Sequence, residues 1–360
     1  MKCLDSIANT IYKPNLIKKL TDLYVFKGKD YYYENIFKKH VSKMVEDTIE
    51  KDAKYVLKIL DLNVKDSRFK SIIRNGLEPK TNAEKVARNL KIIFSLIQKN
   101  GENIILDTNE FLQLATRMFS DVKPVNYTKL KVALDDSLLE DEKSTRPAFR
   151  ESLKKFKNLV SDKEYEPIQA ITRLYVDIAK NDIFDSNNDV LSLIILYCLL
   201  FSQRFLAFKY VSFFEIYYNK MDAFKAALYS AFYRYEEGVP DPSILNEMII
   251  DLMLEAYRIT DKISYDKSFT VQGELHISKQ DDVCSAILKL PDNFTKADVQ
   301  KLNPFVSEST IARALEQLKK DKKIRSNGTG RSATWTKIST DLDYTKTIEQ
   351  MSIYSFLEED

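Results

Sequence analysis

The 360-residue chain is poor in the residues that catalytic and metal sites most often use. It has two histidines, His40 and His276, and three widely spaced cysteines, Cys3, Cys198 and Cys284. Two isolated histidines argue against a zinc site and against a histidine-based catalytic triad. The cysteine spacing gives neither a disulfide framework nor a paired metal motif. We therefore expect no metal site and no cofactor.

Glycine and proline are also scarce, with 7 and 9 residues, which favours long helices and few tight turns. The N-terminus lacks a signal-peptide pattern, and the apolar run LSLIILYCLLF is too short to cross a membrane. We expect an intracellular, cytoplasmic protein without membrane contact. The 55 basic and 53 acidic residues nearly cancel, so the net charge of +2 indicates no class of partner.

What is present is a series of helical patterns that extends to about residue 263. Apolar residues recur at helical spacing in residues 34–60, in NAEKVARNLKIIFSLIQ from Asn82, and in TNEFLQLATRMF from Thr108. Most of the 20 tyrosines and 20 phenylalanines lie on these apolar stripes, where an aromatic side chain is far more often core than ligand platform. The sequence predicts a mainly α-helical protein.

The chain changes character after about residue 275. Thr295 and Asp298 form a capping-box pattern, and Ser307 or Ser309 suits the cap of a second helix. IRSNGTGRSATWTKI then predicts a β-hairpin that turns at Asn327–Gly328. Helix, turn, helix and hairpin in this order predict a winged helix-turn-helix.

The charge of this region differs from the nearly neutral balance of the whole chain. Residues 295–340 have ten Lys or Arg against four Asp or Glu, and residues 341–360 have one Lys against six acids. Side chains that suit base edges or phosphates are Ser309, Thr310, Arg313, Gln317, Arg325, Asn327, Thr329 and Arg331. The module is therefore expected to bind DNA, although Glu308 would repel phosphates and winged helices also serve protein contacts.

NDIFDSNNDVLS, residues 181–192, separates two apolar helical runs, IQAITRLYVDIAK and VLSLIILYCLLF. It has no glycine, but Asn and Asp tolerate left-handed turns and cap helices, so a plain connector explains it.

The order of parts resembles the Fic (filamentation induced by cAMP) family. The resemblance rests on the opening LTDLYVFKGKDYYYENIFKKHVSKM, the helical core, FKYVSFFEIYYNKMDAFKAAL and the C-terminal module. Active members carry the loop His-Pro-Phe-x-Asp-Gly-Asn-Gly-Arg-x-x-Arg between two core helices and transfer AMP, or a related group, from a nucleotide to a protein hydroxyl. That loop aligns without gaps on residues 181–192.

The alignment implies that catalytic groups have been replaced. The family's base falls on Asn181, whose amide cannot accept a proton near pH 7. Ile183 replaces the anchoring Phe, while Asp185 and Asn187 keep the magnesium-holding acid and the Asn beside the phosphates. Four further changes are Gly to Ser186, Gly to Asn188, Arg to Asp189 and Arg to Ser192. Side chains narrow the phosphate pocket, and Asp189 reverses its charge. Asp185 with Asp189 could hold a bare cation, but a solvated helix cap explains them better.

Many Fic proteins also restrain themselves with a helix that reads Ser/Thr-x-x-x-Glu-Gly/Asn. SIIRNG, residues 71–76, resembles it through Ser71 and Gly76, but Asn75 replaces the glutamate. Loss of this glutamate together with the arginine at Ser192 is typical of an active site that no longer catalyses its reaction. We therefore expect no catalytic residue.

The resemblance implies four parts: an N-terminal helical segment with this remnant (1–80), a Fic-like core (81–265), the winged helix (275–340) and an acidic tail (341–360). The leading interpretation is a pseudoenzyme that regulates through DNA binding and uses its body for dimerisation or signal sensing. Two alternatives stay open: a protein-interaction partner, for example of an active Fic enzyme, and an enzyme with residual nucleotide-dependent AMP transfer through Asp185 and Asn187.

Overall fold

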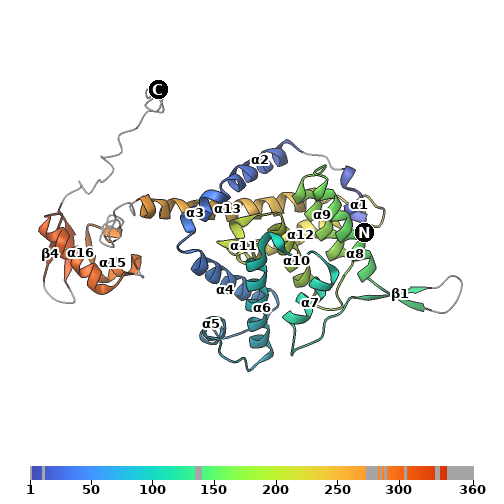
Figure 1. The fold of residues 1–360 in the computed structure, drawn as a ribbon, viewed down its shortest axis with the longest axis horizontal. Helices are drawn as coiled ribbons and strands as arrows, with labels where there is room; N and C mark the ends of the chain where they lie inside the picture. The colour runs from blue at the N-terminus through green and yellow to red at the C-terminus, as the bar shows by residue number, and fades with distance from the viewer. Residues whose placement is uncertain are drawn as a thin grey trace. The chain divides into compact units, whose positions relative to one another are not determined.

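The computed structural model describes residues 2–9, 13–133, 140–272, 283, 286–287, 290–303, 306–328 and 333–338. These residues form two compact units, Met1–Ser264 and Tyr265–Asp360 (Figure 1). Thr329, Arg331 and the acidic tail lie outside the described residues. No helix among those described is long and apolar enough to cross a membrane.

The N-terminal unit, called the body below, is helical, as the sequence predicts. Its α-helices are α1 (Lys2–Asp5), α2 (Pro14–Gly28), α3 (Asp30–Phe37), α4 (Val41–Ile59), α5 (Asp66–Asn75), α6 (Asn82–Asn100), α7 (Thr108–Met118), α8 (Arg146–Ser161), α9 (Pro167–Lys180), α10 (Asn188–Ser202), α11 (Phe213–Asn219), α12 (Met221–Ala231) and α13 (Ser243–Gln272). Short 3-10 turns, η1 (Ile7–Asn9), η2 (Gly101–Asn103) and η3 (Leu206–Lys209), join some of them.

Helix starts in the body follow local capping chemistry. Thr81 accepts a hydrogen bond from the Glu84 amide at the start of α6, and Glu166 accepts one from the Gln169 amide at the start of α9. These contacts satisfy amide groups that have no partner inside the helix. The predicted helices from Asn82 and Thr108 are thereby confirmed.

One element of the body was missed. Strands β1 (Lys129–Ala133) and β2 (Glu140–Ser144) pair antiparallel and project from the body beside α8 (Figure 1). Their sequences, KLKVA and EDEKS, are rich in charge and lack the apolar alternation that marks a half-buried strand.

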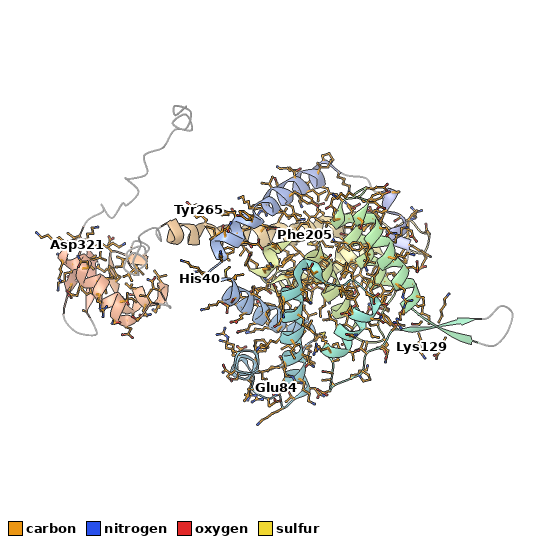
Figure 2. All side chains as sticks on the ribbon, in the orientation of Figure 1. His40, Glu84, Lys129, Phe205, Tyr265 and Asp321 are labelled. Carbon is orange, nitrogen blue, oxygen red and sulfur yellow. The ribbon has the colours of Figure 1, made fainter. Side chains whose placement is uncertain are left out.

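Helix α10 runs through the middle of the body and is buried on every face, from Val190 to Phe201. Side chains of the surrounding helices fill the space around it (Figure 2). At its centre, the Tyr197 hydroxyl donates to the carboxylate of Asp52 on α4 at 3.3 Å. Ser212 and the Phe214 amide donate to the other Asp52 oxygen.

The C-terminal unit has its own apolar core, which includes Phe294, Val299, Ile311, Leu315 and Trp335. Its elements are β3 (Asn293–Thr295), α15 (Lys296–Leu302), α16 (Glu308–Lys320), β4 (Ile324–Asn327) and β5 (Thr334–Lys337). The strands form one antiparallel sheet in the order β3-β5-β4.

Two local predictions for this unit are confirmed and one is corrected. Thr295 and Asp298 form a capping box, and Ser307 caps α16. The strands of the hairpin are separated by residues 328–333, so their connection is longer than a two-residue Asn-Gly turn.

The buried Asp52 carboxyl makes stability depend on pH. Burial raises its pKa to about 7, against hydrogen bonds from Ser212, Phe214 and Tyr197 that lower it. Between the unfolded pKa of about 3.9 and this value, the folded state binds more protons than the unfolded state. The unfolding free energy of the parent should therefore fall, relative to Asp52→Asn, by up to about 1.4 kcal/mol per unit as the pH rises from about 4 to 7.

Urea unfolding of both proteins at pH 5 and pH 8 measures this difference. Asp162→Asn, at the exposed end of α8, is the matched control and should track the parent. An identical gap between parent and Asp52→Asn at both pH values would contradict the assignment.

Candidate functional site

Residues 181–187 form a compact turn between α9 and α10. Asp182 and Asn187 have positive φ angles of 41° and 52°, in the left-handed region that Asn and Asp tolerate better than other side chains. The turn thus uses the backbone property for which glycine is the usual choice, as expected from its composition.

Asn181 stands where the resemblance expects the catalytic base, and its amide nitrogen is fully used. It donates at 2.7 Å to the Asp177 carbonyl oxygen and at 2.7 Å to the Tyr235 hydroxyl. Tyr235 in turn donates to the buried Asp177 carboxylate, which also accepts the amides of Cys3 and Leu4 in α1. Asn181 is therefore part of a structural network that joins α9 to α1.

The middle of the turn is bonded to the segment that leads into β1. Ile183 is fully buried, as expected of an anchor. Its carbonyl oxygen accepts from the Thr128 amide at 3.0 Å and also from the Thr145 hydroxyl, at the start of α8, at 2.8 Å. Phe184 stacks on Tyr127 with ring centroids 5.4 Å apart. Long-range contacts of this kind leave no local pattern in the sequence.

Asp185 and Asn126 add a two-way link between the same segments. The Asp185 amide donates to the Asn126 carbonyl oxygen at 3.0 Å, and the Asn126 amide donates to Asp185 Oδ1 at 3.1 Å. Ser186 also donates to Asp185 Oδ1, at 3.3 Å. One oxygen of the acid that the resemblance assigns to magnesium is thus held by protein groups.

Asn188 fills the inside of the turn, where the resemblance expects glycine. Its side chain is 8% exposed; Oδ1 accepts from the Phe184 amide and Nδ2 donates to Asp182 Oδ1, both at 3.2 Å. Ser192 is fully buried and donates to the carbonyl oxygens of Asn188 and Asp189 inside α10. Neither side chain is free to bind a phosphate.

The turn lies beside an open cavity of about 710 Å³. Its charged lining consists of Asp182, Asp185, Asp189, Lys129 and Lys225, and among the described residues no arginine lines it. Ile59 and Leu60, at the end of α4, form part of the wall. In the part of the chain that the structure describes, no group of three His, Cys, Asp or Glu side chains could hold a metal ion.

The residues of the expected inhibitory motif lie elsewhere. Ser71 and Asn75 belong to α5, which packs on α6, and these residues do not line the cavity. Ser71 donates to the Ser67 carbonyl oxygen in its own helix. Gly76 ends α5 with φ of 67°, a left-handed conformation that glycine adopts without strain. Its presence has a backbone reason that requires no inhibitory role.

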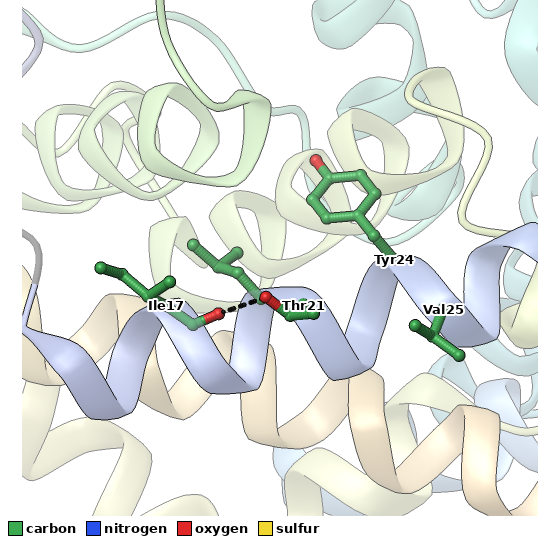
Figure 3. Close-up of a pocket in the computed structure, with 5 residues that line it drawn as sticks. Ile17, Thr21, Tyr24 and Val25 are labelled. Carbon is green, nitrogen blue, oxygen red and sulfur yellow. Dashed lines mark hydrogen bonds between the residues drawn. The ribbon is translucent and has the colours of Figure 1, made fainter.

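A shallow apolar depression along α2 is lined by Ile17, Leu20, Thr21, Tyr24 and Val25 (Figure 3). The Thr21 hydroxyl donates to the Ile17 carbonyl oxygen at 3.0 Å. The depression therefore offers no charged group for chemistry.

In the C-terminal unit, Ser309, Arg313 and Gln317 are exposed on one side of α16, and Arg325 is exposed on β4. The described residues give neither arginine an ion-pair partner. Gln317 donates to Asp321 at 3.1 Å.

Three of the predicted DNA contacts also have structural roles here. Ser309 and Thr310 hydrogen-bond through their hydroxyls to the Ser307 cap. Asn327 donates to Thr336 at 2.6 Å and so joins β4 to β5.

No known protein-family profile and no curated protein sequence matches the chain. Solved structures do. A Fic family protein from Desulfovibrio desulfuricans G20 matches with a TM-score of 0.53 and 10% identity, over 91% of this chain and 97% of that one. A Fic domain containing signaling protein from Bacteroides thetaiotaomicron VPI-5482 matches with a TM-score of 0.51 and 8% identity, over 68% of this chain and 97% of that one.

The first match covers more of the chain than the body alone, so it includes part of the C-terminal unit. Identities this low inform on architecture and not on chemistry. Together with the helical body and the placement of residues 181–192 between α9 and α10, the matches show that the chain has a Fic-like fold.

Proposed function

We propose that the protein binds duplex DNA through a C-terminal winged helix and that its Fic-like body transfers no nucleotide. The observation that carries the proposal is a pair of exposed arginines, Arg313 on α16 and Arg325 on β4, to which the described residues give no ion-pair partner. They belong to a segment, residues 295–340, with ten basic and four acidic residues. Unpaired cations on a basic face are the electrostatic footprint of a phosphate-binding surface.

The element order supports this interpretation. Two helices joined by a short turn are followed by a β-hairpin, which is the arrangement in which a second helix enters the major groove. Arg313 lies four residues after Ser309 on the exposed side of α16, at a position suited to base edges. Glu308 would oppose phosphates, but Lys296 pairs with it at 3.1 Å and offsets its charge.

The absence of transfer is proposed from the chemistry of the turn. Asn181 is an amide already bonded to Asp177 and Tyr235, so it has no means of taking a proton from a target hydroxyl. Asp189 would place a carboxylate beside a triphosphate, where charge stabilisation requires a cation. Asn188 fills the space that an anion would need.

The first test measures DNA binding by fluorescence anisotropy, with the full chain and a random-sequence duplex across a salt series. We expect micromolar or tighter binding at low salt. Arg325→Ala should lower the slope of log K against log salt by about 0.9, because one phosphate contact is lost. Arg150→Ala, an exposed arginine of the body, makes the same charge change and should leave the slope unaltered.

Arg313→Ala should behave differently from Arg325→Ala. Loss of a base contact should reduce the preference for sequences selected from a random pool, at a cost of about 1–3 kcal/mol for the selected site. Absence of binding at micromolar protein would reject the DNA-binding function and favour a protein partner for this unit.

The second test concerns transfer. With labelled ATP, magnesium and cell lysate, we expect no label on the protein or on any other protein. Asn181→His should not restore labelling, since Asp189 still repels the phosphates. Label that disappears in Asp185→Ala would refute the proposal and establish the body as an enzyme.

Nucleotide affinity gives a separate readout. ATP at millimolar concentration should not raise the unfolding temperature measurably, because no arginine among the described residues lines the cavity. A ligand at a hundred times its Kd would stabilise the fold by about 2.7 kcal/mol, which a thermal shift detects easily. A clear shift of the parent's unfolding temperature with ATP would contradict the loss of the pocket.

A further inference from the structure

A second, smaller cavity of about 260 Å³ also adjoins the turn and shares Asp182, Asp189, Tyr217 and Lys225 with the first. It lies between helices α9, α11 and α12, and its two carboxylates come from Asp182 in the turn and Asp189 at the start of α10. Its lining is Tyr175, Ala179, Lys180, Asp182, Asp189, Tyr217, Lys225, Leu228, Tyr229 and Phe232. The volume is below the roughly 300–1,000 Å³ of sites for drug-sized ligands, so the cavity suits a smaller molecule.

Two buried tyrosines offer donor groups to this cavity. Tyr175 and Tyr217 are each 2% exposed and both line it. The structure gives neither hydroxyl a hydrogen-bond partner among the described residues. Burial, together with neighbouring groups that include the Asp189 charge, raises the pKa of both above the usual value, so both remain proton donors.

Most other buried tyrosines of the body use their hydroxyls, although Tyr210 has no partner among the described residues. Their partners are Asp261 for Tyr33, Asp52 for Tyr197, Asp177 for Tyr235 and Asp30 for Tyr257. Neither the Tyr175 nor the Tyr217 phenol oxygen is among the fully buried polar atoms that have no partner. Both hydroxyls are therefore accessible and can donate to a molecule that enters the cavity.

The charges around the cavity are balanced. Asp182 and Asp189 supply two carboxylates, and Lys180 and Lys225 supply two ammonium groups. The described residues give neither Asp189 nor Lys225 an ion-pair partner. Lys180 lies over the Phe232 ring, 5.5 Å from its centroid. A ligand that carries only one sign of charge could pair with either the two carboxylates or the two ammonium groups. A small zwitterion could pair with both.

The walls between the charged groups are apolar. Leu228 and the rings of Tyr229 and Phe232 come from the end of α12 and the residue after it. Such a surface removes an apolar or aromatic side chain from water.

We propose that this cavity binds a free α-amino acid with an apolar side chain. The ammonium group lies at Asp189 and Asp182, the carboxylate at Lys225, and the side chain among Leu228, Tyr229 and Phe232. The phenols of Tyr175 and Tyr217 donate to the carboxylate. This function goes beyond DNA binding and does not depend on it.

Isothermal titration calorimetry on the full chain, without DNA, tests the proposal with L-phenylalanine and L-leucine. Phenethylamine and 3-phenylpropionate serve as matched probes, since each keeps the ring and lacks one charged group. We expect one amino acid per chain with a Kd of a millimolar or less, and binding of both matched probes that is weaker by about tenfold or more.

Variants separate the site from non-specific binding. Asp189→Asn should weaken binding of the amino acid by about tenfold, and Tyr217→Phe should weaken it several-fold while keeping the ring in place. Tyr217→Phe removes only a hydroxyl without a partner, so its unfolding temperature without ligand should not fall. Asp162→Asn is the control for the carboxylate and should bind like the parent.

Three results would overturn the proposal: no measurable binding of either amino acid at millimolar concentration, phenethylamine binding as tightly as L-phenylalanine, or unchanged affinity in Asp189→Asn. Each is obtained without DNA. A failure here is therefore distinct from a failure of the DNA-binding function.

Discussion

The burial of α10 on every face is the constraint on which the body depends. A helix with apolar residues all round must be covered all round, and the helices of the body supply that cover. The hydroxyl of its buried Tyr197 donates a hydrogen bond to Asp52, and this contact joins α10 to α4. Since α10 begins at Asn188, the same packing fixes where the turn before it lies.

The turn is held from three directions. Tyr235 and Asp177 bond its first residue and connect it to α1. The segment before β1 bonds its middle through Asn126. Asn188 bonds its inside. Each contact uses an amide or a backbone group where a catalytic loop would need free groups for a substrate, so this geometry favours a structural connector over a transfer site.

Local patterns predicted the local structure well. Helical spacing predicted α6, α7 and α9, and a run of residues that is apolar on nearly every face predicted α10. The Thr295 and Asp298 pair predicted the capping box. Such signals come from neighbours in the chain. Asn181 was correctly placed at the end of a helix, but its bond to Tyr235, 54 residues away, could not be predicted. The β1–β2 hairpin was missed because its charged strands show no alternation.

The cavity proposed to bind an amino acid could not be predicted from local sequence patterns either. Tyr175 and Tyr217 lie on apolar stripes, where an aromatic residue is nearly always core, and both are indeed buried. Only the three-dimensional arrangement distinguishes a phenol that has a partner from one that has none. Gly76 is the opposite case. It matched a regulatory motif, but the left-handed backbone at the end of α5 is enough to explain why a glycine stands there.

The two hydrogen bonds of Asn188 also bear on how this turn tolerates change over evolutionary time. A loop that acquires its shape only around a bound anion keeps its sequence under selection by that anion. Here the side chain of Asn188 holds the shape from within, so the conformation persists without any ligand. The exposed side chain of Asp189 takes no part in these two bonds, so substitution there leaves the shape of the turn in place.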